Sequence, residues 1–129
     1  MVTLPALRPA IVGAALAALD LIEGCEGAAR RASLDANARV WRAGLDALGF
    51  DLLPGSHPIV PVMLHDAKRA QAMARALFER GVHASGFFYP VVPEGRARIR
   101  TQMSAALTPT DLDAALAAFE GAGREVGAT

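Results

Sequence analysis

The stretch Ala97-Arg98-Ile99-Arg100-Thr101-Gln102-Met103-Ser104 alternates apolar and polar side chains along its length. Successive side chains of a β-strand point to opposite faces, so this alternation predicts a strand with one buried face. The buried face is expected to hold Ile99, Thr101 and Met103. The opposite face then carries Arg98, Arg100, Gln102 and Ser104. The sheet that contains this strand therefore has one side for a core and one polar side.

Two guanidinium groups on one strand face can bind a carboxylate or a phosphate through paired hydrogen bonds. An ordinary solvated strand face is the alternative, and the spacing of Arg98 and Arg100 by itself favours that alternative. The pair remains a candidate anion site.

Helices and further strands flank this stretch. Apolar periodicity, caps and turn residues predict helices over 9–23, 28–48, 67–80 and 109–122, and strands over 50–54, 59–64, 82–89 and 97–104. Gly24 is expected to end the first helix in the left-handed conformation, and Pro61 predicts an edge or irregular strand. Asp66 and Thr108 are expected N-caps. The predicted fold class is α/β, of the α+β kind: a small, mostly antiparallel sheet with helices on one face.

Composition narrows the possible partners. The chain has 129 residues, 13 basic against 13 acidic residues and no net charge, which gives no electrostatic footprint for nucleic acid or for an anionic membrane. The apolar stretch 9–19 is shorter than the roughly 20 residues that cross a bilayer. The single cysteine, Cys25, cannot form an internal disulfide. We expect a soluble cytoplasmic protein that binds neither nucleic acid nor membrane.

The sequence lacks common catalytic and metal-binding motifs. His57, His65 and His83 are too far apart for a metal site on one element, so no metal is expected. There is no nucleophile elbow, phosphate-binding loop or dinucleotide fingerprint.

Three longer phrases carry a family resemblance. Ser56 to Leu64 (SHPIVPVML), Gly86 to Pro93 (GFFYPVVP) and Ala97 to Ala106 (ARIRTQMSAA) resemble the C-terminal lobe of the glycine C-acetyltransferases, also called 2-amino-3-ketobutyrate CoA ligases. These enzymes belong to the pyridoxal-phosphate-dependent α-oxoamine synthases, of aminotransferase fold type I. The resemblance implies that residues 1–24 form a connecting helix and that residues 25–129 form the C-terminal small domain, with the large cofactor domain absent.

The resemblance also implies an activity. The full enzyme would join glycine to acetyl-CoA, giving 2-amino-3-oxobutyrate and CoA, as a homodimer with pyridoxal phosphate as electron sink. Arg100 matches the family position that binds the amino-acid carboxylate, whereas Arg98 is expected to be structural, and the loop 89–95 is expected to line the approach to the site. No catalytic or cofactor-binding residue is expected in this chain. The only lysine, Lys68, opens a surface helix and has no Schiff-base context, so the chain alone is predicted to bind no cofactor and to be inactive.

Two positions depart from the family pattern: His65 stands where glycine is usual, and Leu107 where histidine is common. Two alternatives stay open at this point. One is a fragment of another α-oxoamine synthase, such as 8-amino-7-oxononanoate synthase. The other is a stand-alone, non-catalytic interaction module.

Overall fold

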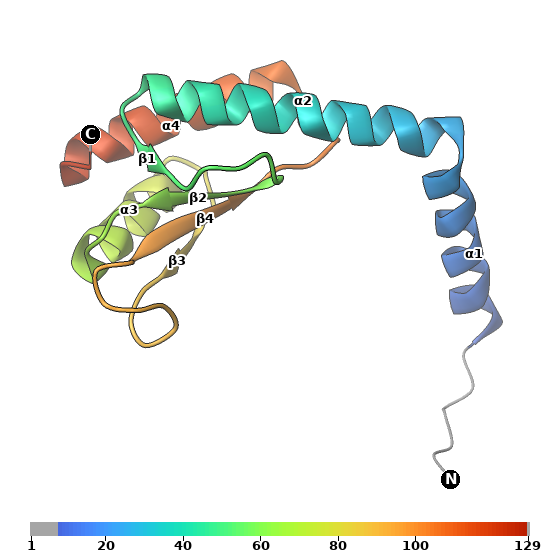
Figure 1. Ribbon diagram of the computed structural model, residues 1–129, viewed down its shortest axis with the longest axis horizontal. Coiled ribbons are helices and arrows are strands. Elements are labelled where there is room, and N and C mark those ends of the chain that lie inside the picture. The colour runs from blue at the N-terminus through green and yellow to red at the C-terminus, as the bar shows by residue number, and fades with distance from the viewer. Residues whose placement is uncertain (1–7, 129) are drawn as a thin grey trace, which may run out of the picture. The chain divides into compact units, whose positions relative to one another are not determined.

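A four-stranded sheet forms one layer of the larger unit in the computed structural model, which describes residues 8–128 (Figure 1). Contacts divide the chain into two units, one ending at Ser33 and one starting at Leu34, and helix α2 (Cys25–Ala47) crosses this boundary. The second unit contains the sheet, the core and the candidate site. This element content confirms the predicted α/β class.

The first unit consists of helix α1 (Pro9–Glu23) and the beginning of α2. Gly24 has φ −83° and ψ −178°, so the prediction of a left-handed cap was wrong, and α2 begins at the next residue. A side chain on Gly27 would collide with the carbonyl oxygen of Ile22, which explains why glycine stands at this junction. Helix α1 buries none of its residues, and most of its large apolar side chains are exposed, among them Leu16 and Leu19. No helix in the described part of the chain is both long enough and apolar enough to cross a membrane.

The sheet has the strand order β1-β2-β4-β3, and all three pairs are antiparallel. Its strands are β1 (Asp51–Leu52), β2 (Ile59–Met63), β3 (Ser85–Phe87) and β4 (Arg98–Gln102). The strand predicted over 82–89 is reduced to three residues, because only these pair with β4. The alternation predicted for β4 is observed, since Ile99, Thr101 and Met103 are buried.

Strand β2 is an inner strand, which corrects the edge position predicted from Pro61. Strand β1 pairs only with Val62 and Met63, so Pro61 lies beyond the end of that ladder. The Pro61 carbonyl accepts a hydrogen bond of 3.4 Å from the amide of Leu53. Because the nitrogen and the carbonyl of a strand residue point to the same side, the missing N–H of Pro61 faces away from β4. The proline therefore removes no bond from the β2–β4 ladder.

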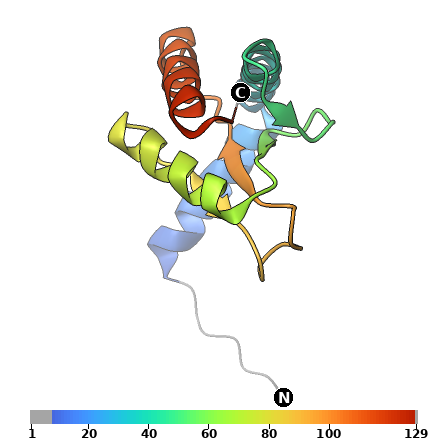
Figure 2. The same cartoon turned by 90° about the vertical axis from the view of Figure 1, so that its left-hand side faces the viewer.

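Three helices cover one face of the sheet, as predicted (Figure 2). They are α2, α3 (Ala67–Glu79) and α4 (Pro109–Val126). Both predicted N-caps are observed: Asp66 accepts from the amide of Lys68, and Thr108 with Asp111 forms a capping box. Hydrogen bonds with Thr108 lower the pKa of Asp111 below its ordinary value of 3.8. Helix α4 runs four residues past its predicted end at residue 122.

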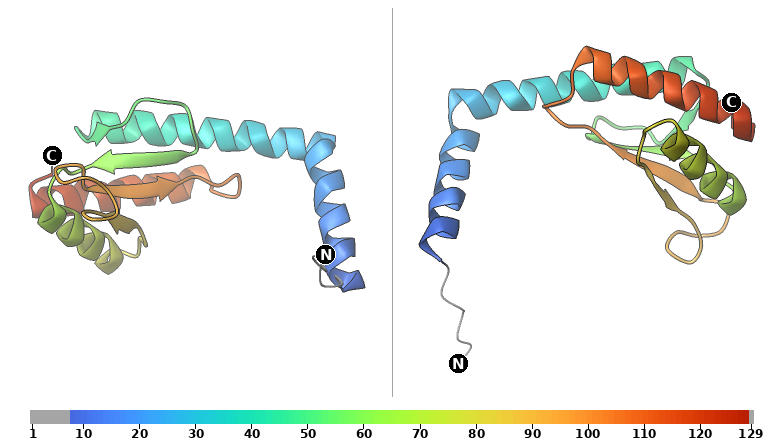
Figure 3. Two further views of the ribbon diagram at one scale, coloured as in Figure 1. Left: turned by 60° about the horizontal axis from the view of Figure 1, so that its bottom comes forward. Right: turned by 180° about the vertical axis from the view of Figure 1, so that it is seen from behind.

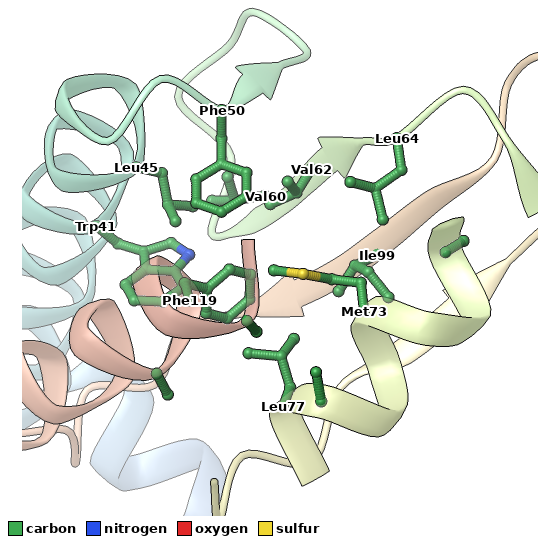
Figure 4. Packing of buried hydrophobic residues seen from close by; sticks show 14 of the residues in the cluster. Trp41, Leu45, Phe50, Val60, Val62, Leu64, Met73, Leu77, Ile99 and Phe119 are labelled. Carbon is green, nitrogen blue, oxygen red and sulfur yellow. The ribbon is translucent and has the colours of Figure 1, made fainter. Parts of the chain in front are cut away.

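Aromatic side chains form the centre of the core (Figure 4). Phe119 of α4 lies edge-to-face against Trp41 of α2, with ring centroids 5.1 Å apart, and against Phe50 at 5.8 Å. Val60, Val62 and Ile99 extend from the sheet into the same cluster. Because the core fills only this side, the residues of β4 that alternate with the buried ones are left on the open face of the sheet.

Candidate functional site

The open face of the sheet, turned away from the three helices, carries the candidate site. The left view of Figure 3 looks toward this side. Arg98, Arg100 and Gln102 of β4 lie on it, as the alternation predicted, and Arg100 is exposed. The register places Pro61 of β2 on one side of Arg100 and Ser85 of β3 on the other.

The Arg100 guanidinium lies over the ring of Phe87, with the guanidinium carbon 4.8 Å from the ring centroid. Phe87 pairs with Arg98 in the register, so it stands diagonally to Arg100 on the same face. A cation over an aromatic face is attracted by the ring quadrupole, and this contact engages none of its N–H groups. The fork of Arg100 therefore remains available to a ligand.

Within residues 8–128, the Arg100 side chain forms no ion pair and no hydrogen bond, whereas the Arg98 side chain forms a hydrogen bond. Arg98 is half-buried, and its Nε donates a hydrogen bond of 3.1 Å to the carbonyl oxygen of Arg96. Asp51, which shares the open face, is itself engaged with His65, whose Nε2 lies 2.8 Å from its Oδ2. The strand thus presents one guanidinium tied to its own loop and one with free donors.

The buried side of β4 holds the strand in place behind Arg100. The Thr101 hydroxyl donates to the carbonyl of Val60 at 2.7 Å and accepts from Trp41 Nε1 at 2.9 Å. Beyond the strand, Asn37 Nδ2 donates to the carbonyls of Ser104 and Leu107 at 2.9 and 3.1 Å. Helix α2 is therefore bonded both to β4 and to the turn that follows it. This framework fixes the backbone from which Arg100 projects.

The described residues do not fit pyridoxal phosphate. A lysine that forms a Schiff base has to be desolvated, whereas Lys68 is exposed in the first turn of α3. Helix α3 covers the sheet face opposite Arg100, so Lys68 and Arg100 do not share a site. The hollow beside Lys68, of about 430 Å³, is lined by charges of both signs, among them Arg75 and Glu79. Within residues 8–128 no cluster of His, Cys, Asp or Glu has the arrangement of a metal site.

The loop between β3 and β4 contains the segment 89–95, which the sequence analysis placed at the approach to the site. Tyr89 and Val91 are exposed there, and Tyr89, Pro93, Glu94 and Gly95 line a hollow of about 400 Å³ together with His65. His65 has φ +68°, the left-handed region that favours glycine. The backbone at His65 thus favours glycine, the residue that the family resemblance led us to expect at this position.

Phe87 was missed as a site residue by the analysis of the sequence. In the sequence Phe87 stands out only as part of the phrase 86–93 that carries the family resemblance, because the strand that positions it pairs over three residues and shows no alternating pattern. The diagonal contact with Arg100 depends on the β3–β4 register, which the sequence does not reveal.

Comparison with known proteins identifies the family. The model of the aminotransferase class I and II family matches residues 1–119. The 2-amino-3-ketobutyrate coenzyme A ligase of Escherichia coli K12 is 50% identical over 121 residues, which are 94% of this chain and 30% of that protein. The 8-amino-7-oxononanoate synthase of Thermoanaerobacter pseudethanolicus is 41% identical over 121 residues, again 94% of this chain and 30% of that protein.

A solved structure shows the same fold. The serine palmitoyltransferase of S. paucimobilis with a bound PLP–myriocin aldimine has a TM-score of 0.87 and 32% identity, over 96% of this chain and 31% of that one. The chain thus spans about 30% of the length of the curated relatives it matches. The family model and the matches to a coenzyme A ligase, an oxononanoate synthase and a palmitoyltransferase agree: the chain belongs to the aminotransferase class I and II family, in its α-oxoamine synthase group.

Proposed function

We propose that this chain is the C-terminal part of a glycine C-acetyltransferase and that Arg100 binds the carboxylate of glycine there. The observation that carries the proposal is the Arg100 guanidinium on the open sheet face, stacked on Phe87 and with its N–H donors unengaged among the described residues. The 50% identity to a 2-amino-3-ketobutyrate coenzyme A ligase, against 41% to an 8-amino-7-oxononanoate synthase, favours glycine and acetyl-CoA as substrates.

The proposed reaction forms a bond between the α carbon of glycine and the acetyl carbonyl carbon. The carbon–sulfur bond of the thioester breaks, the α proton is released, and CoA leaves as the thiol. Arg100 contributes the binding and orientation of glycine, because a planar guanidinium that donates two parallel hydrogen bonds fixes a carboxylate in one plane. Arg98, bonded to its own loop, supports the strand.

Pyridoxal phosphate is part of the proposed whole enzyme and not of this chain. The exposure of Lys68 and its position on α3 support the expectation that the chain alone is inactive. We propose that the matching large domain supplies the lysine and the cofactor, that the whole enzyme is a homodimer, and that it is cytoplasmic. The isolated chain with pyridoxal phosphate, glycine and acetyl-CoA is expected to release no CoA above the blank, and clear turnover would contradict this.

The decisive experiment is a chimera in which this chain replaces the matching C-terminal segment of the E. coli relative. We expect release of CoA that depends on glycine and acetyl-CoA. Arg100→Ala should raise the KM for glycine roughly 10- to 150-fold, the effect of losing a charged hydrogen-bond pair, with little change in the KM for acetyl-CoA. Arg100→Lys should be intermediate, because lysine keeps the charge and loses the fork.

Arg69→Ala serves as the matched control, since Arg69 is an exposed arginine of α3, on the opposite side of the sheet. An active chimera in which Arg100→Ala leaves the dependence on glycine unchanged would remove Arg100 from the site. A folded chimera that turns over another pair of amino acid and acyl-CoA, but not glycine and acetyl-CoA, would favour the alternative of another α-oxoamine synthase.

A further inference from the structure

We propose that Phe87 is the positioning residue for Arg100: its ring holds the guanidinium in the orientation that receives the substrate carboxylate. This inference rests on the proposed function of Arg100. The contact that motivates it is the 4.8 Å between the guanidinium carbon of Arg100 and the centroid of the Phe87 ring.

The location of Phe87 argues against an ordinary core role. Phe87 and Phe88 are adjacent and both half-buried, yet only Phe88 packs against the hydrophobic core. Phe87 lies on the open face instead, where its ring covers the arginine. Of these two phenylalanines, one therefore stabilises the fold, while the other is placed where its ring meets Arg100.

The base of the ring is held firmly. Strand β3 pairs with β4 at Ser85, Gly86 and Phe87, so the backbone of Phe87 is fixed relative to that of Arg100. A Cβ on Gly86 would lie 3.7 Å from the Ala70 carbonyl oxygen, which shows how closely the middle of β3 approaches α3. The ring therefore projects from a strand that is fixed on both sides.

The arginine, by contrast, needs such support. An arginine side chain has many rotamers, and fixing them before the substrate arrives lowers the entropy lost on binding. Among the described residues no carboxylate or carbonyl group orients the Arg100 guanidinium, so the Phe87 ring is the contact that does so. Since stacking occupies no N–H, it orients the group and leaves its donors for the ligand.

The test uses the chimeric holoenzyme described above. Phe87→Leu keeps an apolar side chain and removes the ring face, and it should raise the KM for glycine roughly 2- to 30-fold, the range from an exposed to a desolvated cation–π contact. The kcat and the KM for acetyl-CoA should stay within about twofold, because the contact acts only on Arg100. Phe87→Tyr, which keeps the ring, should restore the wild-type KM. Phe78→Leu, on the exposed side of α3, is the control.

A double-mutant comparison separates the two proposals. In the Arg100→Ala background, Phe87→Leu should add no further increase in the KM for glycine, because the group it positions is gone. If Arg100→Ala raises this KM but Phe87→Leu does not, the positioning role is wrong and the function of Arg100 stands. If Phe87→Leu raises the KM equally in both backgrounds, Phe87 acts by another route and the inference also fails. If Arg100→Ala changes nothing, the proposed function itself is at fault.

A measurement on the 129-residue chain tests the contact without any activity. A proton above an aromatic face is shifted upfield, so Phe87→Leu should move the Arg100 Hε resonance downfield in a spectrum of ¹⁵N-labelled arginine side chains. Phe87→Tyr should leave the resonance close to its wild-type position. An Arg100 resonance that does not respond to Phe87→Leu would overturn the inference.

Discussion

Trp41 Nε1 donates a hydrogen bond of 2.9 Å to the hydroxyl of Thr101, the residue that follows Arg100 in β4. The same hydroxyl donates to the carbonyl of Val60 at 2.7 Å, so one buried oxygen joins α2, β4 and β2. Because Thr101 and Arg100 are consecutive, they point to opposite faces of the sheet. The bond that fixes β4 within the core therefore lies directly behind the residue proposed to bind the substrate.

Thr101→Val is expected to destabilise the chain although it hardly changes the volume of the side chain. It leaves the indole N–H of Trp41 buried without an acceptor, and an unsatisfied buried donor costs about 1–3 kcal/mol. Urea unfolding of the 129-residue chain, followed by Trp41 fluorescence, measures the loss. Thr101→Ser keeps the hydroxyl and should recover most of this stability. A Thr101→Val variant as stable as the wild type would show that the hydroxyl bridge contributes nothing.

Asn37→Ala should loosen the turn that follows β4. The Asn37 amide donates to the carbonyls of Ser104 and Leu107, and its loss should destabilise the chain by about 1–2 kcal/mol. Hydrogen exchange at the amides of Ala106 and Leu107, which are bonded to Ser104, should become faster than in the wild type. Gln71→Ala removes a side-chain amide on the exposed side of α3 and serves as the control. It should leave the exchange rates at the backbone amides of Ala106 and Leu107 unchanged.

The core and the open face of β4 could be predicted from the sequence because both follow from simple periodicity. Ile99 and Thr101 alternate with Arg98 and Arg100, and a strand with this pattern has only one face to bury. The N-caps at Asp66 and Thr108 were equally predictable, because side-chain capping is a local interaction within three residues.

The features that the sequence did not reveal depend on contacts between distant segments. Strand β3 ends where its pairing with β4 ends, and local propensity over 82–89 gives no sign of this. Pro61 is tolerated in an inner strand because its missing N–H faces away from β4 and lies beyond the end of the β1–β2 ladder. Gly24 is extended because α2 begins at the very next residue. The glycine that this junction needs is Gly27, where a side chain would collide with the Ile22 carbonyl. The contact between Phe87 and Arg100 needs the register of two strands, which no local pattern sets.

The capping box of α4 predicts a specific dependence on pH. Hydrogen bonds from Thr108 lower the pKa of Asp111 in the folded chain below 3.8. A carboxylate whose pKa is lower in the folded state stabilises the fold above its unfolded pKa, and this contribution is lost as the pH falls through the folded value. The stabilisation from Asp111 should thus be complete at neutral pH and disappear in the acid range below about pH 4.

Unfolding temperatures measured between pH 7 and pH 2 test this expectation. Asp111→Asn should be less stable than the wild type at pH 7, and the difference should shrink as the pH falls below the Asp111 pKa. Asp113→Asn makes the same change of charge two residues further along α4 and is the control. A carbon NMR titration of the side chain should place the Asp111 midpoint below 3.8. A midpoint at or above that value would contradict the capping interaction.

His65 combines a left-handed backbone, φ +68°, with an exposed contact of its imidazole to Asp51, and two substitutions can separate these effects. His65→Gly and His65→Ala both remove the imidazole, so they differ only in what the backbone tolerates. The left-handed conformation costs a residue with a Cβ about 1–2 kcal/mol, whereas glycine adopts it freely. We expect the glycine variant to be more stable than the alanine variant by about 1 kcal/mol in urea unfolding.

The same pair of substitutions at His83, where φ is not positive, should show the reverse order, because glycine loses more backbone entropy on folding. If alanine is preferred at both positions, the expectation that the left-handed backbone of His65 favours glycine is wrong.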